Sequence, residues 1–366
     1  MKLAWKELTR RPSRFLTAGG ALTLIVILLL LLGGLLDGLY LSATAALRAQ
    51  SASVIVYSTE SRDSLLRSRI EPSTREQVAA VDGVESVTGF GIALLGAKIP
   101  GRSDLADVAV FGYEAANARV PAPLPTGQVY ADRTLQDEGV AIGDTLLLGP
   151  AQTPVTVKGW VEDTAYLFQS GLWANAETWR RVLAENRPDQ VLGPGTFQAL
   201  LVTPHEGVSD QRVANAIDTQ VPGVSALTKQ EAILGLPGVE QQSSTFASII
   251  GVTFLVAGLV VALFFALVTL ERVGLFGVLK AIGANSRTLA AGLALQALLI
   301  AAGAFALGGA LTLLLARVIP PEVPLQLVPK RAIFIAIGIV VTALIGSAIS
   351  FRRIVRIDPA SAVGGS

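Results

Sequence analysis

The chain has 366 residues, of which 51% are hydrophobic and only 16% are charged, and its formal net charge is +1. Its mean hydropathy is positive, which disfavours an ordinary water-soluble domain and makes membrane-spanning segments the first feature to look for. Because the chain contains no cysteine, a disulfide framework and a thiolate metal site are both excluded.

The N-terminal residues 1–14 predict a short amphipathic helix on the cytoplasmic membrane surface. They place Leu3, Trp5 and Leu8 among Lys and Arg side chains. The apolar side chains would enter the interface while the basic ones face anionic headgroups, so membrane lipid is an expected partner. A frayed basic tail is the alternative, because the apolar stripe is short.

Four charge-free apolar runs predict transmembrane helices. Each is at least about 20 residues long, which matches a hydrocarbon core of about 30 Å. The predicted segments are helix 1 with its stalk over 15–47, a second stalk and helix 2 over 241–270, helix 3 over 288–316 and helix 4 over 332–351. A cleavable signal peptide is the alternative for the first run, but its apolar part is longer than a usual signal-peptide core, so we expect a retained anchor.

Basic residues near the ends of these runs predict the orientation of the chain, because Lys and Arg are retained on the cytoplasmic side. They gather before the first run, in residues 271–287 and in the tail 352–366. We therefore expect a multi-pass protein of the bacterial inner membrane, with both termini cytoplasmic and residues 48–240 and 317–331 outside. Residues 48–244 carry 15 Lys and Arg against 23 Asp and Glu, a net charge of −8, which argues against nucleic acid as a partner.

Residues 48–240 predict a large extracytoplasmic α+β domain between helices 1 and 2. Residues 73–87 and 208–227 each predict a helix, a glycine turn and a strand, with Ser73 as the cap of the first helix. An alternating pattern that follows a proline-rich linker indicates a small β module inserted at about residues 126–190.

No motif for catalysis, metal binding or cofactor binding occurs in the chain. It has no phosphate-binding GxxxxGK[ST] loop, no HExxH pair and no GxSxG elbow, and its single histidine, His205, has no partner at ligand spacing. We therefore expect no catalytic residue, no metal site and no cofactor in this chain. The apolar runs themselves, residues 15–36, 249–270, 288–316 and 332–351, contain no Asp, Glu, Lys or Arg. Gln296 is the strongly polar exception in the third, so a polar pathway through them is not expected.

Small residues at helical spacing predict close helix packing in two places. Gly34 and Gly38 form a GxxxG pair at the end of the first run, and Ala304 and Gly308 form a second small pair in the third. Such pairs permit close approach of helices and dimerisation, although they also occur by chance in Ala- and Gly-rich segments.

The stretch ERVGLFGVLKAIGANSRTLA, residues 271–290, connects the second and third apolar runs. Val273, Leu279 and Ile282 recur at helical spacing and predict a short amphipathic helix on the cytoplasmic side. Gly283 would end this helix, and Asn285 can cap the next one. A basic loop placed only by the charge rule is the alternative.

This stretch resembles the cytoplasmic signature of FtsX/MacB-type ABC transporter permeases, the type VII or mechanotransmission superfamily, and within it the DevC-like branch. The matching residues are Glu271, Arg272, Gly277, Leu279, Lys280, Ala281, Ile282, Gly283 and Ala284. The basic C-terminal stretch RRIVRIDPASAV also resembles the ending of that family. The chain departs from the pattern at Gly274 and Leu275, where many relatives carry a charged residue and a Glu-Ile pair.

The resemblance implies a fold and a set of partners. The fold is four transmembrane helices with a large extracytoplasmic α+β domain between helices 1 and 2, and residues 271–287 form a coupling helix on a separate cytoplasmic ABC ATPase that binds ATP and Mg²⁺. A second permease copy, identical or related, is the other expected partner.

The function implied is export or extraction of a hydrophobic or envelope-associated substrate, driven by conformational change of the outer domain. An FtsX-like regulator of a cell-wall hydrolase that performs no transport is one alternative. A membrane-anchored receptor or structural protein without an ATPase is another.

Overall fold

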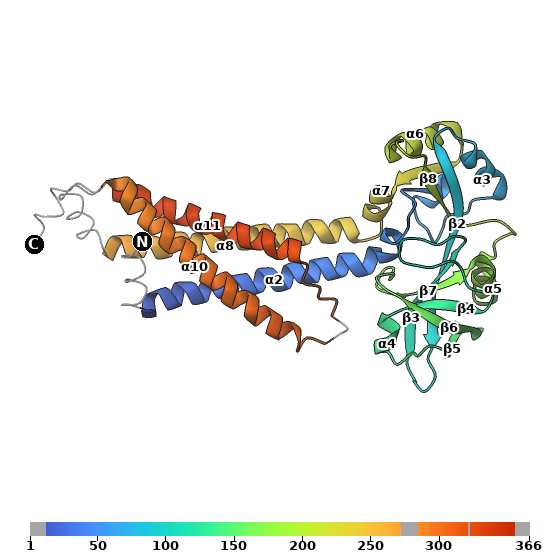
Figure 1. Cartoon of the computed structure of the whole chain (residues 1–366), viewed down its shortest axis with the longest axis horizontal. Coiled ribbons are helices and arrows are strands. Elements are labelled where there is room, and N and C mark those ends of the chain that lie inside the picture. The colour runs from blue at the N-terminus through green and yellow to red at the C-terminus, as the bar shows by residue number, and fades with distance from the viewer. Residues whose placement is uncertain (1–11, 272–284, 321–322, 356–366) are drawn as a thin grey trace, which may run out of the picture. The chain divides into compact units, whose positions relative to one another are not determined.

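The computed structural model describes residues 12–271, 285–320 and 323–355. The chain divides into two compact units, a helical unit formed by residues up to Gly38 and from Gln242 onward, and an inserted domain, Leu39–Gln241. The predicted fold class is confirmed, because four apolar helices and a sheet-rich domain between the first and second of them are present (Figure 1).

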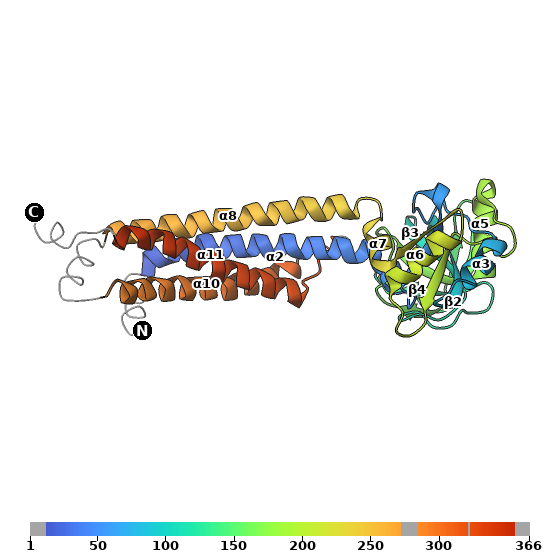
Figure 2. The same cartoon turned by 90° about the horizontal axis from the view of Figure 1, so that it is seen from above.

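The helical unit is built from four long helices, and each contains a segment long and apolar enough to cross a membrane. They are α2 (Pro12–Arg48), α8 (Val239–Glu271), α10 (Ser286–Ala316) and α11 (Pro329–Val355). The helices lie side by side in both views (Figures 1 and 2). Asn285 caps α10 by accepting a hydrogen bond from the backbone N–H of Arg287, as its sequence position predicts.

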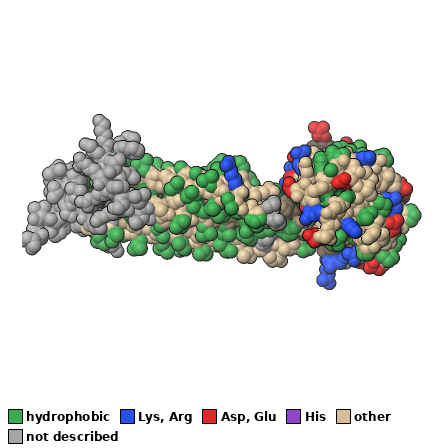
Figure 3. Space-filling model, turned by 90° about the horizontal axis from the view of Figure 1, so that it is seen from below, with side chains coloured by type: hydrophobic (Ala, Val, Ile, Leu, Met, Phe, Trp, Pro, Cys, Tyr) green, Lys and Arg blue, Asp and Glu red, His purple; other side chains and the backbone are tan. Residues whose placement is uncertain are grey.

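Each long helix buries one face against its neighbours and leaves the other apolar and exposed. On α2, Val26 and Leu29 are fully buried, whereas Leu24 is 68% exposed. An exposed apolar surface of this kind is stable in hydrocarbon and not in water. Figure 3 shows hydrophobic side chains over most of the visible helical surface, while charged side chains gather on the inserted domain.

The inserted domain contains a nine-stranded sheet and several short helices. The strands are β1 (Val54–Ser58), β2 (Val84–Lys98), β3 (Leu105–Tyr113), β4 (Gln128–Asp132), β5 (Thr145–Leu148), β6 (Thr153–Val161), β7 (Ser170–Asn175), β8 (Ala199–Pro204) and β9 (Val224–Thr228). The helices are η1 (Thr59–Ser61), α3 (Pro72–Ala79), α4 (Thr134–Asp137), α5 (Ala176–Asn186), η2 (Pro188–Gln190), α6 (Asp210–Gln220) and α7 (Lys229–Leu234).

Six of the strands close into a small barrel. Strand β2 pairs with β3 along one edge and with β5 along the other, and the ring continues through β7, β4 and β6. Closure removes free strand edges, which would otherwise pair with other chains. The strands of the barrel lie within residues 84–175. The barrel therefore begins before the β module that the alternating pattern predicts at about residues 126–190.

The N-terminal half of β2 also belongs to a four-stranded antiparallel sheet, in the order β2-β8-β1-β9. Helices α3 and α6 cover one face of this sheet, and Val78 and Ile217 pack in a common core with Val202. The cap predicted for α3 is wrong: Glu71 is the N-cap residue and makes no side-chain cap bond. Pro72 occupies the first turn instead, where its fixed φ and missing N–H suit the start of a helix.

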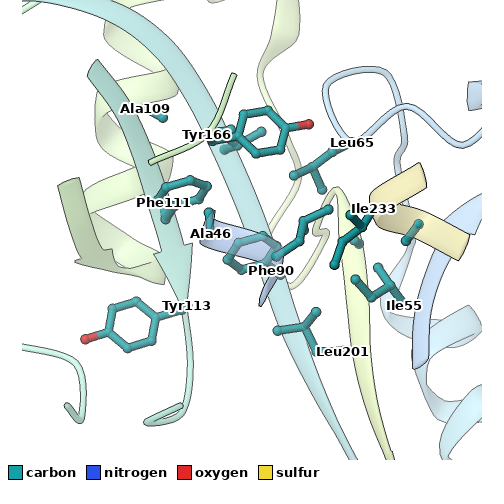
Figure 4. Close-up of a cluster of buried hydrophobic side chains, with 14 of the residues drawn as sticks. Ala46, Ile55, Leu65, Phe90, Ala109, Phe111, Tyr113, Tyr166, Leu201 and Ile233 are labelled. Atoms are coloured by element: carbon teal, nitrogen blue, oxygen red, sulfur yellow. The ribbon is translucent and has the colours of Figure 1, made fainter. Parts of the chain in front are cut away.

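Strand β2 is buried on both faces because it separates two hydrophobic cores. Phe90 and Ile92 point into a core with Phe111 and Trp173, shown in part in Figure 4. The alternate residue Ala93 points into the barrel core. A strand with two buried faces reads as a continuous apolar run, which explains why its sequence lacks a clear polar alternation.

The indole of Trp179, on α5, packs directly on Gly91 and Gly112. A Cβ added at Gly91 would lie 2.1 Å from the Trp179 ring. We expect Gly91→Ala to lower the free energy of unfolding of the inserted domain by about 2 kcal/mol, because a fully buried indole has little room to move. Guanidinium unfolding followed by tryptophan fluorescence measures the change. Gly193→Ala, at an exposed glycine, is the matched control, and equal stability of the two variants would contradict the close packing.

Candidate functional site

The last ten residues of α2 are built into the core of the inserted domain. Ala43, Ala46 and Leu47 are at most 2% exposed, and they pack in one cluster with Phe90 and Phe111. Figure 4 shows Ala46 beside these rings. The sequence predicts a stalk here, but the alanines allow the strands to approach this part of the helix closely.

A loop between β6 and β7, residues 162–169, holds this end of α2; we call it the clasp. Three backbone hydrogen bonds join the two segments. The N–H of Ala46 donates to the carbonyl of Ala165 at 2.9 Å, and the N–H of Leu167 donates to the carbonyl of Ala43 at 3.1 Å. The N–H of Phe168 donates to the carbonyl of Ser42 at 3.4 Å. A displacement of this end of α2 would therefore pull on the clasp through its backbone.

The clasp has an unusual backbone. Asp163, Leu167 and Phe168 have positive φ values of 54°, 47° and 69°, in the left-handed region that favours glycine. Each such residue costs of order 1 kcal/mol or more and persists only where surrounding contacts impose it. Backbone strain of this kind is found in clamps and switch regions, so the clasp is a candidate for transmitting movement.

Side-chain contacts also hold the clasp, to Arg48 of α2, to Arg119 and to β4. The carboxylate of Asp163 accepts from Arg48 of α2 at 2.8 Å and lies 2.9 Å from Arg119. Asp132 of β4, only 2% exposed, accepts hydrogen bonds from the backbone N–H and the hydroxyl of Thr164. Burial raises the pKa of Tyr166, so its phenol stays neutral at physiological pH. The clasp is thus anchored both to α2 and to the barrel.

In the helical unit, α2 and α11 are joined by an ion pair. The guanidinium of Arg331 donates through Nε to both oxygens of Asp37, at 2.7 and 2.8 Å, and its NH2 nitrogen lies 2.7 Å from Oδ1. The Asp37 side chain is 14% exposed. Charge-assisted, two-point bonding of this kind is the strong form of an Arg–carboxylate contact. In the sequence, Asp37 directly follows the first apolar run and Arg331 directly precedes the fourth, and neither position indicates their pairing.

Gly34 and Gly38 lie against the segment that precedes α11. A Cβ at Gly38 would lie 1.6 Å from the carbonyl oxygen of Pro324, and one at Gly34 would lie within 3 Å of Leu325 and Leu327. The backbone N–H of Gln326 donates to the carbonyl of Gly34 at 3.0 Å. The two glycines therefore admit a backbone segment of the same chain.

The second small pair lies between α10 and α2. A Cβ at Gly308 would lie 2.7 Å from the side chain of Val26 and 3.2 Å from the carbonyl of Thr23. Ala304 is 3% exposed in the core of the helical unit. Sequence analysis did not single out Gly346 of α11, where a Cβ would lie 2.9 Å from the backbone nitrogen of Ala262 on α8.

The predicted coupling helix lies almost wholly outside the described residues. Glu271 is the last residue of α8, and its side chain is not among those described. The other predicted coupling residues are outside the described ranges: Arg272, Gly277, Leu279, Lys280, Ala281, Ile282, Gly283 and Ala284. Their role stays a prediction.

Known proteins match this chain over its full length and over shorter segments. Residues 247–359 match the family model of the FtsX-like permease C-terminal domain. The chain is 22% identical to the putative hemin transport system permease protein HrtB of Staphylococcus epidermidis, across 100% of this chain and 99% of that protein. It is 43% identical over 114 residues to an uncharacterized ABC transporter permease of Mycobacterium tuberculosis, which is 31% of this chain and 32% of that one.

One solved structure similar to the chain is the periplasmic region of MacB from Actinobacillus actinomycetemcomitans. It matches with a TM-score of 0.34 and 14% identity, across 50% of this chain and 91% of that one.

Proposed function

We propose that the chain is an ABC transporter permease of the FtsX-like type and that it converts ATP-driven movement of a separate ATPase subunit into a conformational change of the inserted domain. The change would drive export or extraction of a hydrophobic or envelope-associated substrate. ATP and Mg²⁺ would be bound by the ATPase, because this chain has no GxxxxGK[ST] loop.

The observation that carries the proposal is the path of α2. Residues up to Gly38 of this helix belong to the helical unit, and residues from Leu39 to Arg48 belong to the inserted domain, where the clasp holds them. The second connection between the units also falls within a helix, α8. Helical connections support transmission of movement better than flexible linkers, since a helix resists extension and bending.

The orientation is proposed from the charge pattern, and the partners are proposed from the resemblance to the permease family. Basic residues favour a cytoplasmic location for both termini and for residues 271–287, of which 271–284 would contact the ATPase. The inserted domain would then lie outside the inner membrane. A second permease copy, identical or related, would complete the transporter.

The substrate class is proposed from the helices and from the relatives. The sequence of the four apolar runs contains no Asp, Glu, Lys or Arg, so a charged pathway through them is not supported. A substrate that partitions into the bilayer needs no such pathway. Hemin is the first compound to assay, because full-length relatives are named for its transport.

Co-purification tests the proposed ATPase partnership. The full chain is expressed in a bacterial host, together with the ATPase subunits of that host's FtsX-type transporters or with the ATPase encoded beside it. It is then solubilised in mild detergent and captured by a tag. An ATP-binding subunit in stoichiometric amount is expected. Capture without any ATP-binding subunit would favour a receptor or structural protein, and capture of a cell-wall hydrolase without substrate transport would favour an FtsX-like regulator.

Glu271→Ala and Gly283→Pro are expected to reduce the ATPase stimulation that the permease gives its partner, by about tenfold, because both residues match the coupling signature and a proline breaks a helix or its turn. Membrane insertion should be unchanged. The naturally cysteine-free chain allows insertion to be checked by labelling one introduced cysteine from either side. Glu206→Ala, in an exposed turn of the inserted domain, is the control, and full ATPase stimulation in both coupling variants would reject the assignment.

A further inference from the structure

A cavity of about 260 Å³ lies in the helical unit, between α2, α10, α11 and the segment that precedes α11. Its walls are almost entirely apolar, with Leu30, Phe305 and Ile335 among the lining side chains. The Asp37–Arg331 ion pair also lines it. An apolar cavity with one charged group at its wall has the composition of a ligand site.

The cavity has a charged end and an apolar end. Along α2, its lining residues extend from Leu30 to Asp37, a distance of about 10 Å at 1.5 Å per residue. Along α11, Arg331 bonds Asp37, and Ile335 lies one turn further into the helix. Both helices therefore place charge at one end of the cavity and aliphatic side chains at the other.

The cavity opens on the outer surface of the helical unit. Leu313, one of its lining residues, is 60% exposed. Because α10 is long and apolar enough to span a bilayer, the molecules that meet this surface in a membrane are acyl chains. An occupant can therefore enter sideways from the bilayer.

Charge near the cavity selects the headgroup. Among the described residues of the connection over 317–331, Arg317, Lys330 and Arg331 are basic and none is acidic, and Asp37 offsets the charge of Arg331. The side chains of Arg317 and Lys330 are exposed. A positive rim attracts an anionic headgroup and gives a zwitterionic one no comparable advantage.

We infer that this cavity binds one acyl chain of an anionic phospholipid, with the headgroup held near Arg331 and Lys330. A dry apolar cavity of about 150 Å³ accommodates benzene, so 260 Å³ accommodates a chain segment of about ten carbons. The bound lipid would contact α2, α10 and α11 together. This site does not depend on the ATPase or on the identity of the transported substrate.

Two glycines of α10 give a matched pair of test variants. Gly309 lines the cavity, and a Cβ added there meets no atom within 4 Å, so Gly309→Phe fills the cavity without displacing backbone. Gly303 is exposed, lies on the same helix outside the cavity lining, and also meets nothing within 4 Å. Gly303→Phe therefore carries the same chemical change without entering the cavity.

The probe is phosphatidylglycerol with a photoactivatable diazirine near the end of one acyl chain, and phosphatidylcholine with the same label is the comparison. The full chain is reconstituted in nanodiscs with each lipid, irradiated, digested and mapped by mass spectrometry. We expect phosphatidylglycerol to label the α10 and α11 segments that line the cavity. Gly309→Phe should reduce this labelling about tenfold, Gly303→Phe should not change it, and phosphatidylcholine should label these segments about threefold less.

Headgroup variants test the charged end separately. Asp37→Asn frees the guanidinium of Arg331 and is expected to increase phosphatidylglycerol labelling about threefold, while Lys330→Gln lowers it. Equal labelling by the two lipids would overturn the anionic headgroup. Undiminished labelling in Gly309→Phe would overturn the site itself.

Discussion

Arg331→Ala is expected to lower the free energy of unfolding of the helical unit by about 2 kcal/mol, because it leaves the carboxylate of Asp37, whose side chain is 14% exposed, without its partner. The intact pair has two-point geometry, with Nε of Arg331 2.7 and 2.8 Å from the two carboxylate oxygens. The surroundings are apolar, so water does not replace the lost bonds readily.

A local probe is needed because the chain has two units, and a chain of two units is not expected to unfold in a single transition. Ala301, which is fully buried in α10, offers a suitable position. In a chain without other thiols, the rate of maleimide labelling of Ala301→Cys reports opening of the helical unit. Arg331→Ala should raise this rate about thirtyfold in detergent micelles if labelling follows the equilibrium of opening.

Two further variants decide whether the effect arises from the unpaired charge. Lys330→Ala removes the neighbouring, exposed cation and should change the labelling rate little. Asp37→Leu combined with Arg331→Met replaces the pair by apolar side chains and should recover most of the lost stability. If the double variant were as unstable as Arg331→Ala, the unpaired carboxylate would not be the cause.

Gly38→Ala is expected to displace the segment that precedes α11 and to destabilise the helical unit by about 3 kcal/mol. The new Cβ would lie 1.6 Å from the carbonyl oxygen of Pro324, so a backbone atom has to move. That movement threatens the hydrogen bond from Gln326 to Gly34. In an open helix position the same substitution is stabilising, by about 0.8 kcal/mol, which makes the sign of the effect informative.

Gly303→Ala is the matched control, since it lies in a helix of the same unit and its Cβ meets nothing within 4 Å. It should be neutral or stabilising. A cysteine placed at Leu327, which lies against Gly34, should become more reactive in Gly38→Ala and stay unchanged in Gly303→Ala. Equal behaviour of the two alanine variants would show that Gly38 does not contact this segment in solution.

The GxxxG pair shows where sequence reasoning reached its limit. The spacing of Gly34 and Gly38 predicts close approach of another helix or a second copy, and the structure brings the segment before α11 against both glycines. The pattern cannot say whether that neighbour is another helix, a second copy or a segment nearly 290 residues further along the chain. The present contacts are with Pro324, Leu325 and Leu327, which carry no signal of their own in the sequence.

The clasp is a second feature that no local pattern predicts. Leu167 and Phe168 adopt positive φ although bulky residues rarely do so, and local turn preferences therefore do not predict the conformation of this loop. The N–H groups of Leu167 and Phe168 donate to the carbonyls of Ala43 and Ser42, which lie more than 100 residues earlier in the chain. A long-range contact of this kind overrides local preference only once the domain is assembled.

The amino-acid sequence by itself determined the four apolar helices, the position of the inserted domain between the first and second, and the resemblance to FtsX-type permeases. These follow from run length, charge and motif spacing, which are local properties. The closed barrel, the Asp37–Arg331 pair, the clasp on α2 and the cavity were decided only by tertiary structure. Each depends on which distant segments meet. The packing of whole elements selects these contacts, whereas local periodicity describes each element alone.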